Sequence, residues 1–276
     1  MDQKAYWERE ALAKRRSPDH PVIAAYVLPK IEVVRRYVEL TPQTRLLDVG
    51  CGDGFFMFHF GKICDAYGVD YSERLLRKNP SRKTFRMDAD SLDFEDNSFD
   101  VVFCHSLLHH VEDPDRVVRE MARVSRKHVV ILEPNRNNPI IFLHSLVVGE
   151  ERKGLRFSLA YLRRIARGNG LRVLASFSYG SVVPIRTLEL ALSAVAPLTR
   201  LLSFKHPAGM TNFIIAEKNT RHHFSDKIGC GRRSVADCCY AASQLLCGHG
   251  LSPNGAQYLS PGQRPGSRTP SKTPAL

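Results

Sequence analysis

The nine residues from Leu46 to Gly54 constrain the fold of this chain more than any other segment. They read Leu-Leu-Asp-Val-Gly-Cys-Gly-Asp-Gly, so a short apolar run meets an acidic residue and then three glycines at alternate positions. This pattern is typical of a buried parallel strand that enters a tight loop and then a helix. The glycines let the backbone approach a bound ligand closely. Because the strand ends in an acid and the loop holds no lysine, the pattern favours a nucleoside carrying hydroxyls and an ammonium over a triphosphate.

Three further strand-like blocks follow in order along the chain. The second strand, Tyr67-Gly68-Val69-Asp70, again ends in an acid, about twenty residues after the first, where a doubly wound sheet places the residue that holds a ribose. A third strand and turn cover residues 85–90. A fourth strand covers residues 99–104 and is followed by His105-Ser106-Leu107-Leu108-His109-His110-Val111.

With these four blocks in order, residues 40–218 resemble the class I S-adenosyl-L-methionine (SAM)-dependent methyltransferases. The branch that resembles this chain most is the methyltransferase type 11 branch, which includes the ubiquinone and menaquinone C-methyltransferases. The matching text lies in Leu46 to Gly54, Gly68 to Ser72, Met87 to Val102 and Leu108 to Pro114. The resemblance implies SAM as the cofactor and says much less about the acceptor of the methyl group.

The resemblance also implies roles for individual residues. Asp48 would organise the loop and the methionine end of SAM, while Gly50, Cys51 and Gly52 would present backbone to the methionyl and ribose portion. Asp70 would accept both ribose hydroxyls, and Tyr71 would stack near the adenine. Asp88 would accept from the adenine amino group, with Ala89 supplying backbone contacts and Asp90 as the alternative to Asp88 after a two-residue shift. His105 would touch the methionine moiety through its backbone, with its side chain toward the acceptor.

Two residues are candidates for catalysis. His105 is a candidate general base because an oxygen acceptor must lose its proton and histidine titrates near neutrality. Glu133 ends the fifth apolar strand at the carboxyl edge of the sheet, where open α/β sites lie, and would contact or orient the acceptor. His109 and His110 are weaker candidates, with helix packing as their alternative. No metal is expected, since the Cys and His residues beyond position 221 have no paired Cys-x-x-Cys spacing.

The predicted fold class is α/β, a Rossmann-like, seven-stranded, mainly parallel sheet with helices on both faces, followed by a disordered C-terminal tail. The last strand is expected to be antiparallel and inserted near the edge. We predict an N-terminal helical segment or lid over residues 1–40, with Pro29 interrupting its helix, a methyltransferase domain over residues 41–218, and a disordered low-complexity tail over residues 219–276. Two insertions stand out, Pro139 to Arg156 and the leucine-rich Ser181 to Met210, and the second is predicted to form an apolar lid.

Composition and charge bear on the partners and the localisation of the protein. The net charge of +12 is scattered along predicted helix faces with no interleaved basic and aromatic block, which disfavours nucleic acid as partner and leaves peripheral contact with anionic lipid open. No apolar run reaches the roughly 18 residues of a membrane span. The polar N-terminus does not resemble a secretory signal. Cytoplasmic localisation is therefore the expectation.

The function predicted from these features is methyl transfer from SAM to a small, lipid-like or aromatic acceptor, on oxygen or carbon. Two alternatives stay open, an RNA or protein methyltransferase and a catalytically silent SAM-binding partner subunit. A silent relative usually loses the glycine loop or the ribose acid, and this chain keeps both. A Rossmann dehydrogenase is disfavoured because Asn97-Ser98-Phe99-Asp100 has no role there.

Overall fold

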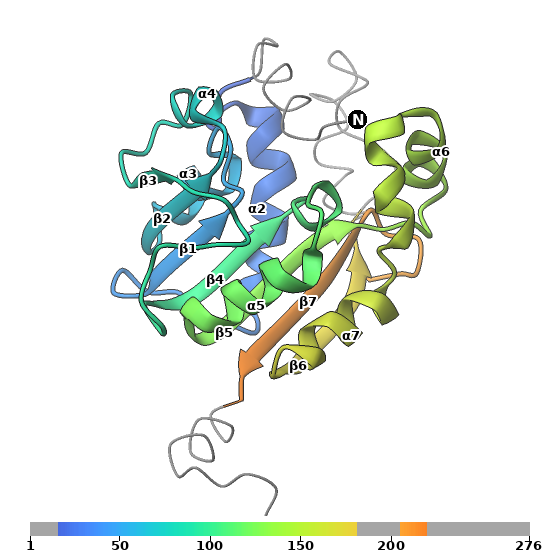
Figure 1. The fold of residues 1–276 in the computed structure, drawn as a ribbon. Coiled ribbons are helices and arrows are strands. Elements are labelled where there is room, and N and C mark those ends of the chain that lie inside the picture. Colours follow the sequence, from blue (N-terminus) through green and yellow to red (C-terminus); the bar gives the residue numbers. More distant parts are fainter. Residues whose placement is uncertain (1–15, 181–204, 220–276) are drawn as a thin grey trace, which may run out of the picture. The chain divides into compact units, whose positions relative to one another are not determined.

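The computed structural model describes residues 16–180 and 205–219. These residues form an α/β domain around one sheet, in which helices connect most of the successive strands (Figure 1). The strands are β1 (Arg45–Val49), β2 (Asp65–Asp70), β3 (Thr84–Arg86), β4 (Phe99–His105), β5 (Ser125–Pro134), β6 (Leu171–Tyr179) and β7 (Thr211–Lys218). The helices are α2 (Pro21–Arg35), α3 (Phe55–Phe60), α4 (Glu73–Leu76), α5 (Pro114–Val124), α6 (Pro139–Val147) and α7 (Leu159–Gly168), with 3₁₀ turns η1 (Leu108–His110) and η2 (Gly149–Arg156).

The sheet of the described residues has seven strands in the order β3-β2-β1-β4-β5-β7-β6. β1 to β5 pair in parallel, whereas β7 runs antiparallel to both β5 and β6. The predicted seven-stranded, mainly parallel α/β fold is confirmed, including the antiparallel last strand that is inserted beside the edge strand. Chain order reverses between β1 and β4, which is the switch point where open α/β sheets bind ligands at the carboxyl ends of their strands.

Two apolar clusters cover the two faces of the sheet, because successive strand residues point to opposite sides. On one face α2 and α3 pack on Leu46, Phe103 and Val130. On the other face α5 and α7 pack on Leu47, Val102 and Ile131. Figure 1 shows α5 and α7 on one side of the strands and α2 on the other. This layering leaves the carboxyl edge of the strands for the site.

Helix α2 corrects the expectation of a break at Pro29. The helix runs without interruption from Pro21 to Arg35, with Pro29 inside it. An internal proline costs a helix about 3 kcal/mol through one lost hydrogen bond and a ring clash. Val27, Ile31 and Val34 bury completely against the sheet, and this tertiary packing offsets the local cost.

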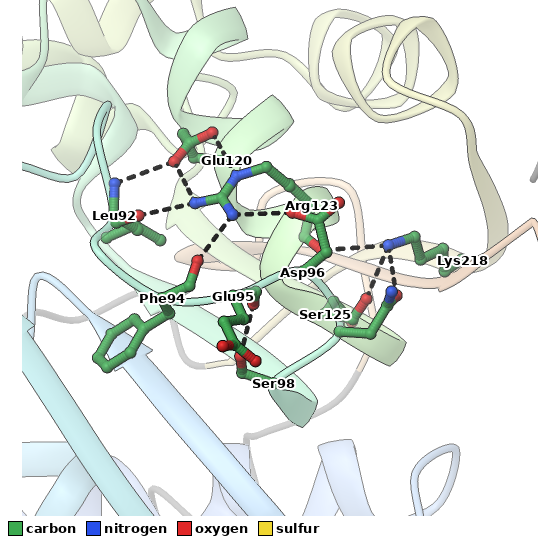
Figure 2. Close-up of polar contacts among 10 residues, drawn as sticks. Leu92, Phe94, Glu95, Asp96, Ser98, Glu120, Arg123, Ser125 and Lys218 are labelled. Carbon is green, nitrogen blue, oxygen red and sulfur yellow. Dashed lines mark hydrogen bonds and ion pairs between the residues drawn. The ribbon is translucent and has the colours of Figure 1, made fainter.

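A single arginine fixes the long connection from β3 to β4. The Arg123 guanidinium donates to the Leu92 and Phe94 carbonyls, at 2.7 Å each, and to the Asp96 and Glu120 carboxylates, at 2.9 Å each (Figure 2). Glu120 in turn accepts from the Leu92 N–H at 2.9 Å. Because α5 anchors this connection at several points, its first residues, 87–90, leave the end of β3 in a defined direction.

Candidate cofactor and acceptor site

The loop that follows β1 requires glycine at positions 50 and 52. Gly50 and Gly52 have φ of 76° and 50°, in the left-handed region that side chains disfavour. A Cβ on Gly50 would also lie 2.9 Å from Leu107 Cδ1. The loop is held by the Gly50 and Cys51 N–H groups, which donate to the Val69 carbonyl at 2.8 and 3.0 Å. Gly50 and Gly52 carry no side chain and are only partly buried, so part of their backbone is accessible.

The Asp70 carboxylate lies at the end of β2 directly beside this loop. The Gly52 N–H donates to Asp70 Oδ2 and the Ser72 N–H to Asp70 Oδ1, both at 2.9 Å. These two backbone donors orient the carboxylate at the end of the strand. An acid held in this way beside a bare backbone fits the paired hydroxyls of a ribose.

Asp48 is a buried acid at the carboxyl end of β1. Burial raises its pKa well above the usual range, and the nearby Asp70 charge adds to the rise. Two acids this close repel each other unless a cation lies between or beside them. SAM carries both a sulfonium and an ammonium, and a cation beside these acids favours their ionised forms, so the pair fits that cofactor.

Cys51 presents only its backbone to the site. Its Sγ packs toward β2, 2.6 Å from where a Cβ on Gly68 would stand, and its side chain is buried. Burial raises the pKa of the Cys51 thiol well above its usual range, and the Asp48 and Asp70 charges add to this. The thiol therefore stays protonated and serves packing.

The expected adenine side lies after β3. The Met87 N–H donates to the Asp70 carbonyl at 3.1 Å, so the next residues, Asp88 and Ala89, lie near the carboxyl end of β2. Asp88 is exposed, whereas the Asp90 carboxylate faces Arg116 Nε at 3.9 Å. The choice between Asp88 and Asp90 as the adenine contact stays a prediction. Tyr71 borders the same area, with its carbonyl accepting from Arg86 Nε at 3.1 Å.

His105 ends β4 and turns its ring toward α2 and α3. Its Nε2 lies 2.9 Å from the Tyr26 hydroxyl, and its ring centroid lies 4.6 Å from that of Phe56. Burial and the nearby Lys30 charge hold the pKa of His105 well below its usual range. The ring is therefore neutral at pH 7 and carries a lone pair that can take a proton.

Glu133 is completely buried and is bound on both oxygens. Oε1 accepts from the Leu107 and Leu108 N–H groups at 2.9 and 2.8 Å, and Oε2 lies 2.6 Å from His109 Nδ1. These contacts fix the turn after β4, where Ser106 has a strained φ of 51°. Leu107 from the same turn covers Gly50. Glu133 therefore holds the turn that carries Leu107 against Gly50.

His109 connects Glu133 to a second carboxylate. Its Nε2 lies 3.2 Å from Glu151 Oε2, so the imidazole bridges two acids from β5 and η2. Burial lowers the pKa of His109, but the two carboxylates outweigh it and raise the pKa to about 9. Ligand atoms of His109, His110 and Glu151 lie within 4.8 Å of one another, a spacing that can also hold a metal ion.

Three of these residues were missed by the sequence reasoning: Tyr26, Lys30 and Glu151. Lys30 left a detectable signal, because it lies inside the apolar stripe of α2. Glu151 left none, since its partner is 42 positions away in the chain. The predicted lid over 181–210, except its last six residues, and nearly all of the predicted tail over 219–276 lie outside the described residues. Among those described, no helix is long and apolar enough to cross a bilayer.

Comparisons with known proteins agree with this geometry. Residues 47–132 match the family model described as a methyltransferase domain. The chain is 37% identical over 93 residues to phosphatidylethanolamine N-methyltransferase of Cereibacter sphaeroides, covering 30% of this chain and 46% of that protein. It is 30% identical over 119 residues to ubiquinone biosynthesis O-methyltransferase of Neisseria meningitidis, covering 38% and 50%. The chain thus spans about half the length of these curated relatives.

Solved structures share the fold. A SAM-dependent methyltransferase of Thermotoga maritima, a possible histamine N-methyltransferase, superposes with a TM-score of 0.56 at 19% identity, over 78% of this chain and 96% of that one. A putative methyltransferase from an antibiotic biosynthesis pathway of Anabaena variabilis gives a TM-score of 0.54 at 15% identity, over 70% and 98%. The family match, the sheet order and the paired acids at the glycine loop agree on one cofactor, SAM. Residues 47–132 carry the methyltransferase domain, and the described residues have the fold of SAM-dependent methyltransferases.

Proposed function

We propose that this protein transfers the methyl group of SAM to oxygen or carbon of a small acceptor with a lipid-like or aromatic body. The observation that carries the proposal is the pairing of Asp70 with the bare Gly52 backbone beside the buried Asp48. The names of the two curated relatives, which refer to phosphatidylethanolamine and ubiquinone biosynthesis, support a small lipid-related acceptor.

SAM supplies a methyl group that its sulfonium already activates. The protein then needs to align donor and acceptor and exclude water. Asp70 holds the ribose through charge-assisted hydrogen bonds, and Asp48 lies where the methionine end carries its positive charges. The Gly50 to Gly52 backbone supplies close contacts along the cofactor. These residues bind and orient, and none of them forms a bond to the methyl group.

His105 takes the proton of a hydroxyl acceptor in this proposal. When Nε2–H donates to the Tyr26 hydroxyl oxygen, the neutral imidazole has its free lone pair on Nδ1, and the 2.9 Å contact with Tyr26 fixes the ring. The ring lies one position beyond Cys104, which pairs with Val49 just before the glycine loop. A base in this place is next to the expected position of the methyl group.

The decisive test of the cofactor site uses Asp70→Asn, with the exposed Asp93→Asn as the matched control on the neighbouring connection. A charge-assisted hydrogen bond contributes roughly 1.5–3 kcal/mol, so the affinity for S-adenosyl-L-homocysteine should fall about 10- to 100-fold in Asp70→Asn. Calorimetry should show no more than a twofold change in Asp93→Asn. Equal affinities in the parent and in a folded Asp70→Asn protein would refute the ribose role.

A further inference from the structure

Lys30 is a buried lysine for which the described part of the chain provides no carboxylate. Lys30 is only 7% exposed, and its Nζ donates to the Tyr26 carbonyl at 3.1 Å. The same nitrogen lies 3.2 Å from the centroid of the Tyr26 ring. A buried ammonium is costly unless an anion pairs with it. Burial lowers the pKa of Lys30 to about 7.

Lys30 lies in a group of polar side chains at the sheet edge. Tyr26, one turn before it on α2, contacts His105 Nε2 through its hydroxyl at 2.9 Å. His105 in turn packs on Phe56, in the first turn of the helix that follows the glycine loop. We name Lys30, Tyr26 and His105 the basic corner. Tyr26 and His105 are only partly buried, so the corner can be reached from their exposed side.

We propose that the basic corner binds an anionic oxygen group of the methyl acceptor, a carboxylate or a phosphate, with Lys30 as its ion-pair partner. This inference rests on the proposed function and adds the charge of the substrate to it. The corner supplies an ammonium and a phenol hydroxyl, and both can donate to an anionic oxygen. Aromatic and apolar neighbours lower the local dielectric, which strengthens attraction to an anion and repulsion of a cation.

The other explanation is that Lys30 only packs on the Tyr26 ring. The chain offers a comparison, because Lys62 Nζ lies 4.1 Å from the Phe58 ring centroid at the surface. An exposed ammonium can make that contact and remain hydrated. Within the residues that the structure describes, Lys30 loses its water without gaining an anion, so ring contact alone does not account for its burial.

The experiment uses the full chain saturated with S-adenosyl-L-homocysteine and three probes of similar size. These are 4-hydroxybenzoate, phenyl phosphate and the neutral 4-hydroxybenzamide, titrated calorimetrically into the parent, Lys30→Met and Lys62→Met. The parent and Lys62→Met should bind one of the anions at least tenfold more tightly than the amide, and the preferred anion identifies the source as carboxylate or phosphate. Lys30→Met should lose the preference, keep its affinity for S-adenosyl-L-homocysteine within twofold, and unfold at an equal or higher urea concentration.

A second measurement needs no variant. Acetic anhydride should acetylate Lys30, and the preferred anion should slow this at least fivefold while Lys62 is unaffected, as read by peptide mass spectrometry. Equal binding of all three probes by the parent would overturn the proposal, as would a preference that survives in Lys30→Met or a Lys30 acetylation rate that no probe changes. Failure of the parent to bind S-adenosyl-L-homocysteine would instead overturn the proposed function.

Discussion

The bridge from Glu133 through His109 to Glu151 should make folding stability depend on pH in a defined window. Folding raises the pKa of His109 from 6.5 to about 9. Between these values the folded protein keeps a proton that the unfolded chain releases. The contribution is therefore complete below pH 6.5 and is lost as the pH rises through 9. At roughly 1.4 kcal/mol for each pH unit, the loss amounts to about 3 kcal/mol.

The titration of Lys30 changes stability with pH in the opposite direction, so its contribution must be removed from the measurement. Its pKa falls from 10.5 to about 7 on folding, so above pH 7 the unfolded chain holds a proton that the folded protein has released. That group makes the protein more stable as the pH rises, which offsets the loss at His109 between pH 7 and 9. The total stability of the parent should consequently change little across this range.

The informative quantity is the difference in unfolding free energy between the parent and His109→Gln. A glutamine amide can still donate to Glu133 but does not titrate, and Lys30 contributes equally to both proteins. Urea unfolding followed by circular dichroism at pH 6, 7, 8 and 9 should show the difference shrinking by about 3 kcal/mol. A difference that stays constant from pH 6 to 9 would refute the charged bridge.

Two further predictions concern the supports of the site. Gly50→Ala should cost about 1–3 kcal/mol of stability and weaken cofactor binding, because its φ is 76° and its Cβ would displace Leu107, whereas Gly168→Ala, with open space around it, should gain about 0.5–1 kcal/mol. Arg123→Met should lower the free energy of unfolding by about 2–4 kcal/mol through loss of its four partners (Figure 2), while the exposed Arg119→Met should stay within about 0.5 kcal/mol. Urea midpoints that are equal in the two arginine variants would contradict the second prediction.

The local parts of this molecule could be predicted from the sequence. The apolar strand, the acid and the glycines are adjacent in the chain, so Asp48, Gly50 and Gly52 could be placed without knowing any distant contact. The same holds for the end of β2 at Asp70. The roles given to Tyr71, Asp88 and Ala89 stay predictions, because they depend on how a bound nucleoside lies.

The contacts between distant segments could not be predicted. Periodicity placed Glu133 at the sheet edge but could not show that the turn after β4 bonds to Oε1 and His109 to Oε2. A direct contact of Glu133 with the acceptor stays a prediction, and its observed contacts favour a positioning role. Pro29 shows the reverse error, since a local rule predicted a break that burial of α2 overrides.

The position of β7 has a consequence for the order in which the protein folds. β7 is the last strand of the sheet along the chain, yet it lies between β5 and β6, with His128 opposite Glu217 and Leu171 opposite Lys218. During synthesis β5 and β6 therefore expose unpaired edges until residues 211–218 are available. Exposed edges of buried strands pair readily with other chains. A nascent chain stalled before Thr211 should thus be prone to aggregate, and its rescue should depend on when the last strand inserts.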